Sequence, residues 1–178
     1  MSEGLRTPYK TALETAEIVV RQLRPMCERI EIAGSLRRKK ADVGDIELVC
    51  IPRPSADLLG DLYISDSGIM LALSKMGISW LMIKKNGQHF KQLIFKGISI
   101  DLFLTTTAQW GIIFMIRTGS ADFSHRMVTP RSQGGLMPSN LRVKDGLLWE
   151  DENCLQTPEE EDVFRIFGMN WIEPENRI

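Results

Sequence analysis

The chain has 178 residues and a formal net charge of -1, with hydrophobic residues at 43% and charged residues at 25%. These proportions are typical of one globular domain, or of one domain with a small second one, and exclude a disordered or fibrous chain. The near-zero net charge argues at first against a nucleic-acid-binding protein with a basic surface all over.

The chain also lacks the signals of membrane proteins, secreted proteins and zinc proteins. No apolar run reaches the roughly 18 residues of a membrane-spanning helix, and the N-terminus has no signal-peptide core. Three scattered cysteines and two histidines do not have metal-ligand spacing. We therefore expect an intracellular monomer without a membrane partner, in the cytoplasm or in the nucleoid of a host.

The charge is unevenly distributed along the sequence. Residues 75–144 hold 10 basic side chains against only Asp101 and Asp122, whereas residues 145–178 hold 10 acidic side chains against two basic ones. We call residues 75–144 the basic segment. It could supply a surface that faces phosphates, although solvated faces can also differ in charge by chance.

The first part of the chain alternates helical and strand patterns. Thr7 as cap and Pro8 as first residue predict a helix over residues 8–24. A polar loop over residues 34–44 separates two predicted strands, and a Lys-Asn-Gly turn joins two more. The expected elements are strands at 30–33 and 45–51, a helix at 66–76, and strands at 78–84, 88–95 and 98–104.

The second part is predicted to be helical with a small hairpin. Thr157 as cap, Pro158 as first residue and Glu160 as third residue mark the last helix, which ends before Gly168. The other expected elements are helices at 107–116 and 120–128 and strands at 140–143 and 147–149. Helices interleaved with mostly antiparallel strands give the fold class α+β.

Two carboxylates lie on one face of the strand predicted at 45–51. Asp45 and Glu47 are two residues apart, so both side chains leave the same face. Such a pair repels itself unless a cation lies between, and a hard divalent ion prefers oxygen ligands. An exposed polar face of an edge strand is the alternative explanation.

The loop before this strand favours the metal-site interpretation. Gly34 and Ser35 follow a strand, where backbone and hydroxyl donors can meet an anion, and Gly44 could admit another phosphate. Arg37 and Arg38 supply forked donors suited to phosphate oxygens. Phosphate donors beside paired carboxylates predict a site for a nucleoside triphosphate with its magnesium.

Asp101 is the candidate for a third carboxylate. It is the only charged residue in the strand predicted at 98–104, and it lies between Ile100 and Leu102. Transfer through two metal ions needs a further carboxylate near the attacking hydroxyl, and a buried carboxylate needs a partner.

These blocks resemble the active-site signature of family X DNA polymerases, the group of DNA polymerase beta. The resemblance rests on Gly34-Ser-Leu-Arg-Arg38 with the following Asp-Val-Gly-Asp-Ile-Glu-Leu-Val, and on Ile100-Asp-Leu-Phe103. Two later blocks agree, Thr118-Gly-Ser-Ala-Asp-Phe123 and the C-terminal run that begins at Thr157. Together they extend over nearly the whole chain.

The resemblance implies a palm with a mixed or antiparallel sheet and flanking helices over residues 1–106. It also implies a small C-terminal α/β subdomain, thumb-like and facing the nucleotide, over residues 107–178. Asp45, Glu47 and Asp101 would be the catalytic, metal-binding carboxylates for two Mg²⁺ ions, with Mn²⁺ as an alternative. Asp101 would act as general base or share that duty with the metal.

The resemblance further implies binding positions for substrates. The nucleotide-binding residues would be Gly34, Ser35, Arg38, Gly44, Ile116, Arg117, Thr118, Gly119, Ala121 and Ser124. Within the basic segment, the candidates for DNA binding are Lys84, Lys85, Lys91, Lys96, Arg126, Arg131 and Arg142.

Departures from the family pattern affect specificity. Glu47 replaces a more usual Asp, and Ile116-Arg117 stands where many relatives have aromatic residues that screen the sugar. Ser124 replaces a frequent Asn, and Ser99 replaces a basic residue near the primer terminus. The family's lyase domain and its DNA-binding helix-hairpin-helix motifs have no counterpart before Tyr9, so a minimal palm-plus-thumb form is expected.

The expected activity is that of a metal-dependent DNA polymerase that fills short gaps during repair. It would bind primer-template or gapped DNA and deoxynucleoside triphosphates, and it would release pyrophosphate. One alternative is a template-independent or small-acceptor nucleotidyltransferase. Another is a non-catalytic DNA-binding module, which three retained carboxylates disfavour.

Overall fold

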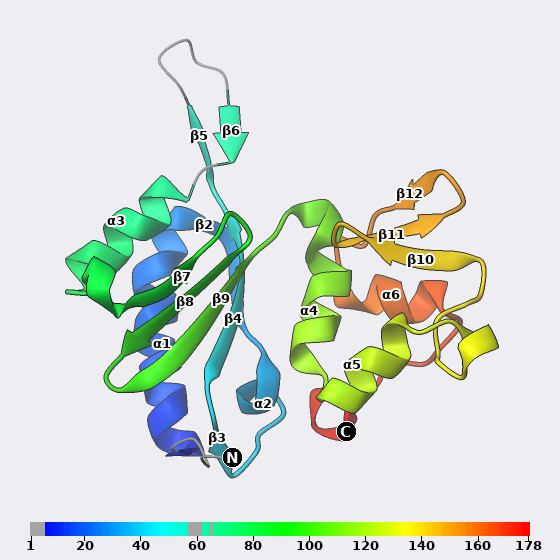
Figure 1. Cartoon of the computed structure of the whole chain (residues 1–178), viewed down its shortest axis with the longest axis horizontal. Coiled ribbons are helices and arrows are strands. Elements are labelled where there is room, and N and C mark those ends of the chain that lie inside the picture. The colour runs from blue at the N-terminus through cyan, green and yellow to red at the C-terminus, as the bar shows by residue number, and fades with distance from the viewer. Residues whose placement is uncertain (1–5, 57–61, 65) are drawn as a thin grey trace. The chain divides into compact units, whose positions relative to one another are not determined.

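A computed structural model describes residues 6–56, 62–64 and 66–178, and these form two compact units. The N-terminal unit contains Met1–Ile32 and Lys40–Thr105, and the C-terminal unit contains Ala33–Lys39 and Thr106–Ile178 (Figure 1). The segment Ala33–Lys39 therefore belongs with the C-terminal unit although it precedes most of the N-terminal one. Whether residues 1–106 and 107–178 are separate domains stays a prediction.

A five-stranded mixed sheet forms the centre of the N-terminal unit. Its strands, in spatial order, are β2 (Cys27–Ile32), β4 (Ile46–Pro52), β9 (Ile98–Leu104), β8 (Phe90–Phe95) and β7 (Ile83–Asn86). β4 and β9 are parallel, and every other neighbouring pair is antiparallel. The sheet confirms the predicted α+β class.

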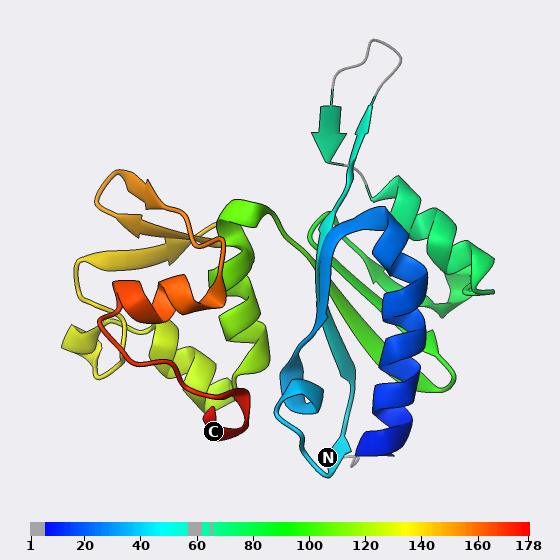
Figure 2. The same cartoon turned by 180° about the vertical axis from the view of Figure 1, so that it is seen from behind.

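One face of this sheet is apolar and covered. Ile46, Leu48 and Cys50 of β4 are fully buried, because alternate residues of a strand point to one face. Helix α1 (Tyr9–Leu23) packs on β2 and β4, and α3 (Ser67–Lys75) packs on α1 (Figure 2). Glu47 points to the opposite face and is half-buried.

The start of α1 differs from the sequence prediction. Thr7 and Pro8 form the short strand β1 (Thr7–Pro8), which pairs with β3 (Asp42–Val43). Pro8 is therefore the N-cap of α1, and no side chain caps this helix. The backbone N–H of Tyr9 instead donates to the Ala41 carbonyl at 3.0 Å.

Smaller elements complete the N-terminal unit. The hairpin of β5 (Pro54–Ala56) and β6 (Leu62–Ile64) extends from the sheet (Figure 1). Two short 3-10 helices are η1 (Arg24–Met26) and η2 (Trp80–Met82). Because η2 takes up part of the range predicted at 78–84, β7 begins only at Ile83.

Short helices and a small sheet make up the C-terminal unit. Its helices are α2 (Gly34–Arg37), α4 (Trp110–Thr118), α5 (Ala121–Val128) and α6 (Glu160–Ile166), with the 3-10 helices η3 (Thr107–Gln109), η4 (Arg131–Gln133) and η5 (Pro174–Asn176). An antiparallel sheet joins β10 (Leu141–Lys144), β11 (Leu147–Glu150) and β12 (Asn153–Leu155). The turn α2 and the strand β12 were not predicted from sequence.

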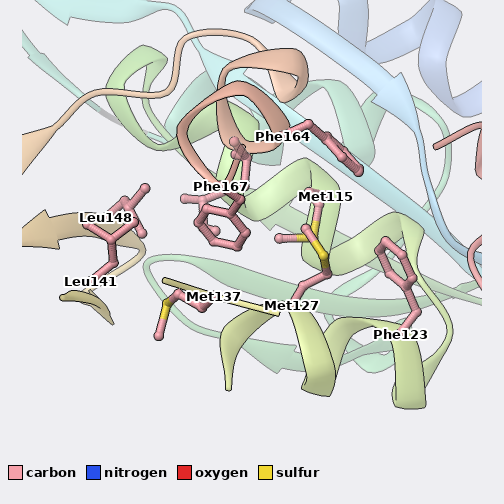
Figure 3. Packing of buried hydrophobic residues seen from close by; sticks show 10 residues of the cluster. Met115, Phe123, Met127, Met137, Leu141, Leu148, Phe164 and Phe167 are labelled. Atoms are coloured by element: carbon pink, nitrogen blue, oxygen red, sulfur yellow. The ribbon is translucent and has the colours of Figure 1, made fainter. Parts of the chain in front are cut away.

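A cluster of buried apolar side chains holds this unit together (Figure 3). α4 also lies unusually close to the chain before α6, because a Cβ on Gly111 would come within 2.1 Å of the Glu159 carbonyl oxygen. The cluster consists of Ile112, Met115, Phe123, Met127, Met137, Leu141, Leu148, Val163, Phe164 and Phe167.

Helix α6 starts later than the sequence predicts. The Thr157 hydroxyl accepts a hydrogen bond from the Ile112 N–H of α4 at 3.2 Å, and Thr157 is not the N-cap of α6. Glu159 is the N-cap instead, and it forms a capping box with Asp162. The predicted end is confirmed, since Gly168 follows the helix with a φ of +65°.

Among the described residues, no helix combines the length and the apolar character that crossing a membrane requires.

Candidate functional site

The three predicted carboxylates all lie in the N-terminal unit, on β4, on β9 or next to them. Asp45 is in the bend before β4, so that strand begins one residue later than predicted, at Ile46. The parallel register of β4 and β9 places Glu47 directly opposite Asp101. All three side chains are half-buried.

Asp45 and Asp101 are close enough to interact through their charges. Burial raises the pKa of the Asp45 carboxyl above its ordinary value, and the negative charge of Asp101 raises this pKa further. Both effects disfavour the ionised form. A cation placed between the two carboxylates would remove this repulsion.

The donor chemistry of this pair fits a hard divalent cation. Carboxylate oxygens suit Mg²⁺ or Mn²⁺, and Mg²⁺ is commonly held by one or two carboxylates together with substrate phosphates. In the part of the chain that the structure describes, no three His, Cys, Asp or Glu side chains form a group that could hold a metal ion by themselves. The fit to a metal therefore rests on the Asp45–Asp101 pair.

Gln92 is a partner of Asp101 that the sequence analysis missed. It lies opposite Asp101 in the antiparallel pairing of β8 with β9, and its Nε2 donates to Asp101 Oδ1 at 2.8 Å. The expectation that Asp101 needs a partner is thus met by a neutral amide. A polar amide next to Lys91 in the otherwise apolar strand Phe90–Phe95 was the available signal, but only the strand register shows what it contacts.

Gly44, which precedes the carboxylates, is surrounded by open space. A Cβ added there would meet nothing within 4 Å, and the residue does not have a positive φ. Packing of the unit therefore does not require glycine at this position.

The turn between α4 and α5 is built in the C-terminal unit from residues predicted to bind nucleotide. The Ser120 hydroxyl caps α5 by accepting from the Phe123 N–H at 3.1 Å, and the Ser124 hydroxyl donates to the Ile116 carbonyl at 2.7 Å. Gly119 is sterically required, because a Cβ would lie 2.5 Å from atoms of Phe123 and Ser124.

Arg38 holds this turn to α2. Its Nη1 donates to the Thr118 carbonyl at 2.5 Å and to the Gly119 carbonyl at 2.7 Å. Gly34, at the start of α2, has a φ of +63°, a left-handed conformation that glycine adopts at little cost. The residues predicted at 34–38 and at 116–124 thus come together within one unit.

Arg37 has a structural role instead of the predicted phosphate-facing one. Its guanidinium binds Glu160 with both nitrogens, Nη1 to Oε1 at 3.0 Å and Nη2 to Oε2 at 2.8 Å, and Nη1 also donates to the Thr118 hydroxyl at 2.7 Å. A bidentate pair with a nearly buried carboxylate engages the forked donors that a phosphate would need.

The predicted DNA-binding residues divide into exposed ones and one buried one. Lys91 is only 1% exposed, and its ammonium group is paired with Asp66 and hydrogen-bonded to Asn86. This burial contradicts the prediction that Lys91 is a surface contact for DNA. The exposed members are Lys84, Lys85, Lys96, Arg126, Arg131 and Arg142.

Two of the exposed arginines have partners in the C-terminal unit. Arg131 donates to the Phe167 carbonyl at 2.5 Å, and Arg142 lies 3.8 Å from the Glu152 carboxylate. Both side chains remain accessible at the surface.

Comparison with known proteins gives one family match and a strong structural match. A family model described as DNA polymerase beta thumb matches residues 114–178. The fold is similar to a crystal structure of Leishmania infantum polymerase beta in a ternary P/T complex, with a TM-score of 0.75 and 16% sequence identity. The similarity covers 98% of this chain and 77% of that chain. The C-terminal part of the chain therefore matches a polymerase beta thumb, and the chain as a whole has a fold similar to the palm and thumb of polymerase beta.

Proposed function

We propose that the chain is a metal-dependent DNA polymerase that adds deoxynucleotides to a primer 3′-hydroxyl in short gaps. The observation that carries this proposal is the pair Asp45 and Asp101, since the charge of Asp101 raises the pKa of Asp45 and a bound cation would relieve this repulsion; Glu47 lies opposite Asp101 in the strand register. The thumb match and the likeness to a polymerase solved in a P/T complex support DNA as the substrate.

The carboxylates would divide the chemistry between them. Asp45, Glu47 and Asp101 would hold Mg²⁺ or Mn²⁺, which when bound offsets phosphate charge and lowers the pKa of the primer hydroxyl. Asp101 would accept the proton of that hydroxyl as its oxygen forms a bond to the α-phosphorus. The bond from the α-phosphorus to the bridging oxygen breaks, and pyrophosphate leaves.

The remaining positions would bind substrate. Ser35, Arg38 and Gly44 are proposed triphosphate contacts, and Thr118 and Gly119 would lie by the sugar of the nucleotide. The open space around Gly44 supports its part of this proposal. Arg38 would act there in addition to holding the Thr118 and Gly119 carbonyls.

Primer extension on a one-nucleotide gap tests the proposal. We expect incorporation of the nucleotide complementary to the template in the presence of Mg²⁺ or Mn²⁺, and none in the presence of EDTA. Asp101→Asn is expected to reduce turnover by about 100-fold or more while the fold is retained, because a proton acceptor is lost. Asp145→Asn is the matched control, since Asp145 lies in an exposed turn with a φ of +53° that Asn tolerates.

The same assay separates the alternative functions. Equal incorporation with and without a template strand would indicate a template-independent nucleotidyltransferase. DNA binding by folded protein without incorporation of any nucleotide would indicate a non-catalytic module. Full activity of Asp101→Asn would refute the catalytic assignment of that residue.

A further inference from the structure

Four polar side chains form a row across the sheet of the N-terminal unit. Lys85 of β7 lies opposite Gln92 of β8, Gln92 lies opposite Asp101 of β9, and Asp101 lies opposite Glu47 of β4. We call these four residues the polar row. Because they are cross-strand partners, adjacent members lie about 5 Å apart at the backbone.

Within the polar row, Gln92 supplies a donor to the acidic side. Asp101 has an acidic neighbour in Glu47 on β4 and is close enough to Asp45 to raise its pKa. Gln92 Nε2 donates to Asp101 Oδ1 at 2.8 Å from the opposite side, on β8. An ionised carboxylate can accept hydrogen bonds but cannot donate them, so the amide of Gln92 must present its NH₂ group to it.

A neutral donor suits a carboxylate that also has to bind a cation. A Lys or Arg at position 92 would place a fixed positive charge beside Asp101 and compete with a metal ion. The amide fixes the carboxylate plane without reducing the negative charge of the group. Because an ionised carboxylate has about four acceptor sites on its two oxygens, this one hydrogen bond to Oδ1 leaves others for the metal or for the substrate proton.

We propose that Gln92 is a positioning residue, which orients the Asp101 carboxylate for metal binding and for proton transfer from the primer hydroxyl. This inference rests on the proposed polymerase function. It adds a residue that acts through Asp101 without touching the substrate. Outer hydrogen-bond partners of metal ligands typically contribute about 10–100-fold to metal affinity or activity.

Gln92→Met tests the proposal, because Met has nearly the same length and no donor. We expect kcat on gapped DNA to fall at least 10-fold with an unchanged KM for the nucleotide. Mn²⁺ titration of the full chain without DNA or nucleotide, followed by electron paramagnetic resonance, should show the Mn²⁺ dissociation constant rising by about 10-fold. The control Gln88→Met changes an exposed residue in the turn before β8 and should leave both quantities unchanged.

A second variant and a spectroscopic measurement keep the proposal testable even if Gln92→Met does not fold or the protein is inactive. If Gln92→Met fails to fold by circular dichroism, Gln92→Asn is used, whose amide is one methylene too short to keep the 2.8 Å contact. In the metal-free protein, the side-chain NH₂ resonances of Gln92 should shift in Asp101→Asn and stay in place in Asp145→Asn. The shift reports the contact directly and does not require activity.

The outcomes separate this inference from the proposed function. If the wild type polymerises, and the Gln92 variant keeps both its kcat and its Mn²⁺ affinity, the inference is overturned and the polymerase function stands. If the wild type does not polymerise, but Mn²⁺ binding depends on both Asp101 and Gln92, the function fails and the orienting role of Gln92 is supported. If the wild type neither polymerises nor binds Mn²⁺, both fail.

Discussion

Asp45 is half-buried as a carboxylate next to another carboxylate, and this arrangement should reduce the stability of the metal-free protein. Burial and then the charge of Asp101 raise its pKa, so the folded state favours the protonated form. A raised pKa contributes stability in acid that is lost as the pH rises through the folded-state pKa. At neutral pH the charged Asp45 is therefore unfavourable for folding.

We predict that Asp45→Asn raises the denaturation midpoint of the metal-free protein at pH 7, because Asn is neutral at every pH. The gain should shrink as the pH falls below about 4, where Asp45 itself becomes protonated in both states. Urea denaturation in EDTA at pH 7 and at pH 3.5 measures it.

The control for this prediction is Asp151→Asn, in the exposed turn between β11 and β12. It should change the midpoint little at either pH. A lower midpoint for Asp45→Asn at pH 7 would contradict the inference that this site is built for a cation at a cost in stability.

At the scale of elements, Glu160 at the start of α6 connects three segments of the C-terminal unit. Its carboxylate forms ion pairs with Arg37 of α2 and with Arg177 of the C-terminal segment, and the Arg177 side chain is fully buried. Arg177 also lies over the rings of Phe164 and Trp171, at 5.1 and 4.6 Å from their centroids. Without Glu160, a buried guanidinium would lose its counter-charge.

We predict that Glu160→Gln destabilises the protein by about 3–5 kcal/mol, the usual cost of removing one partner of a buried ion pair. Thermal or urea denaturation followed by circular dichroism measures the change. Glu161→Gln, at an exposed neighbouring position of α6, carries the same change of charge and should cost less than about 0.5 kcal/mol. Equal effects of the two substitutions would show that Glu160 contributes only to the surface charge.

The sequence predicted an element correctly where neighbouring residues alone determine it. β9 was predicted at its observed bounds, Ile98–Leu104, because the pattern is strongly apolar and Gly97 closes the turn before it. The turn α2 was missed, since four residues are too few to show a helical period. Thr157 had the sequence of a cap, but its hydroxyl is used by α4, which lies far away in the sequence.

The candidate site shows the same division. Asp45, Glu47 and Asp101 were found from spacing and polarity, whereas Gln92 required the pairing of β8 with β9. Lys91 was taken for a surface residue because a lysine is rarely buried, and only its tertiary partner Asp66 explains its position. Contacts between residues that are far apart in sequence decide these cases.

For the whole molecule, the net charge of -1 conceals a basic segment that would have to provide the DNA contacts. Its lysines do not contribute equally, because Lys91 is buried whereas Lys84 and Lys85 of β7 are exposed. Each phosphate contact releases counterions, so the affinity for DNA should fall as the salt concentration rises. The slope of log K against log salt is proportional to the number of phosphates that Lys and Arg side chains contact.

We predict that the double substitution Lys84→Gln and Lys85→Gln weakens binding to gapped DNA and reduces the slope of log K against log salt by about 1–2. Fluorescence anisotropy with labelled gapped DNA over a series of KCl concentrations measures both. The double substitution Lys10→Gln and Arg21→Gln, at exposed positions of α1, changes the net charge equally and should leave the slope unchanged. If both double variants reduce the slope alike, the protein binds DNA through its overall charge, and β7 does not form a directed contact.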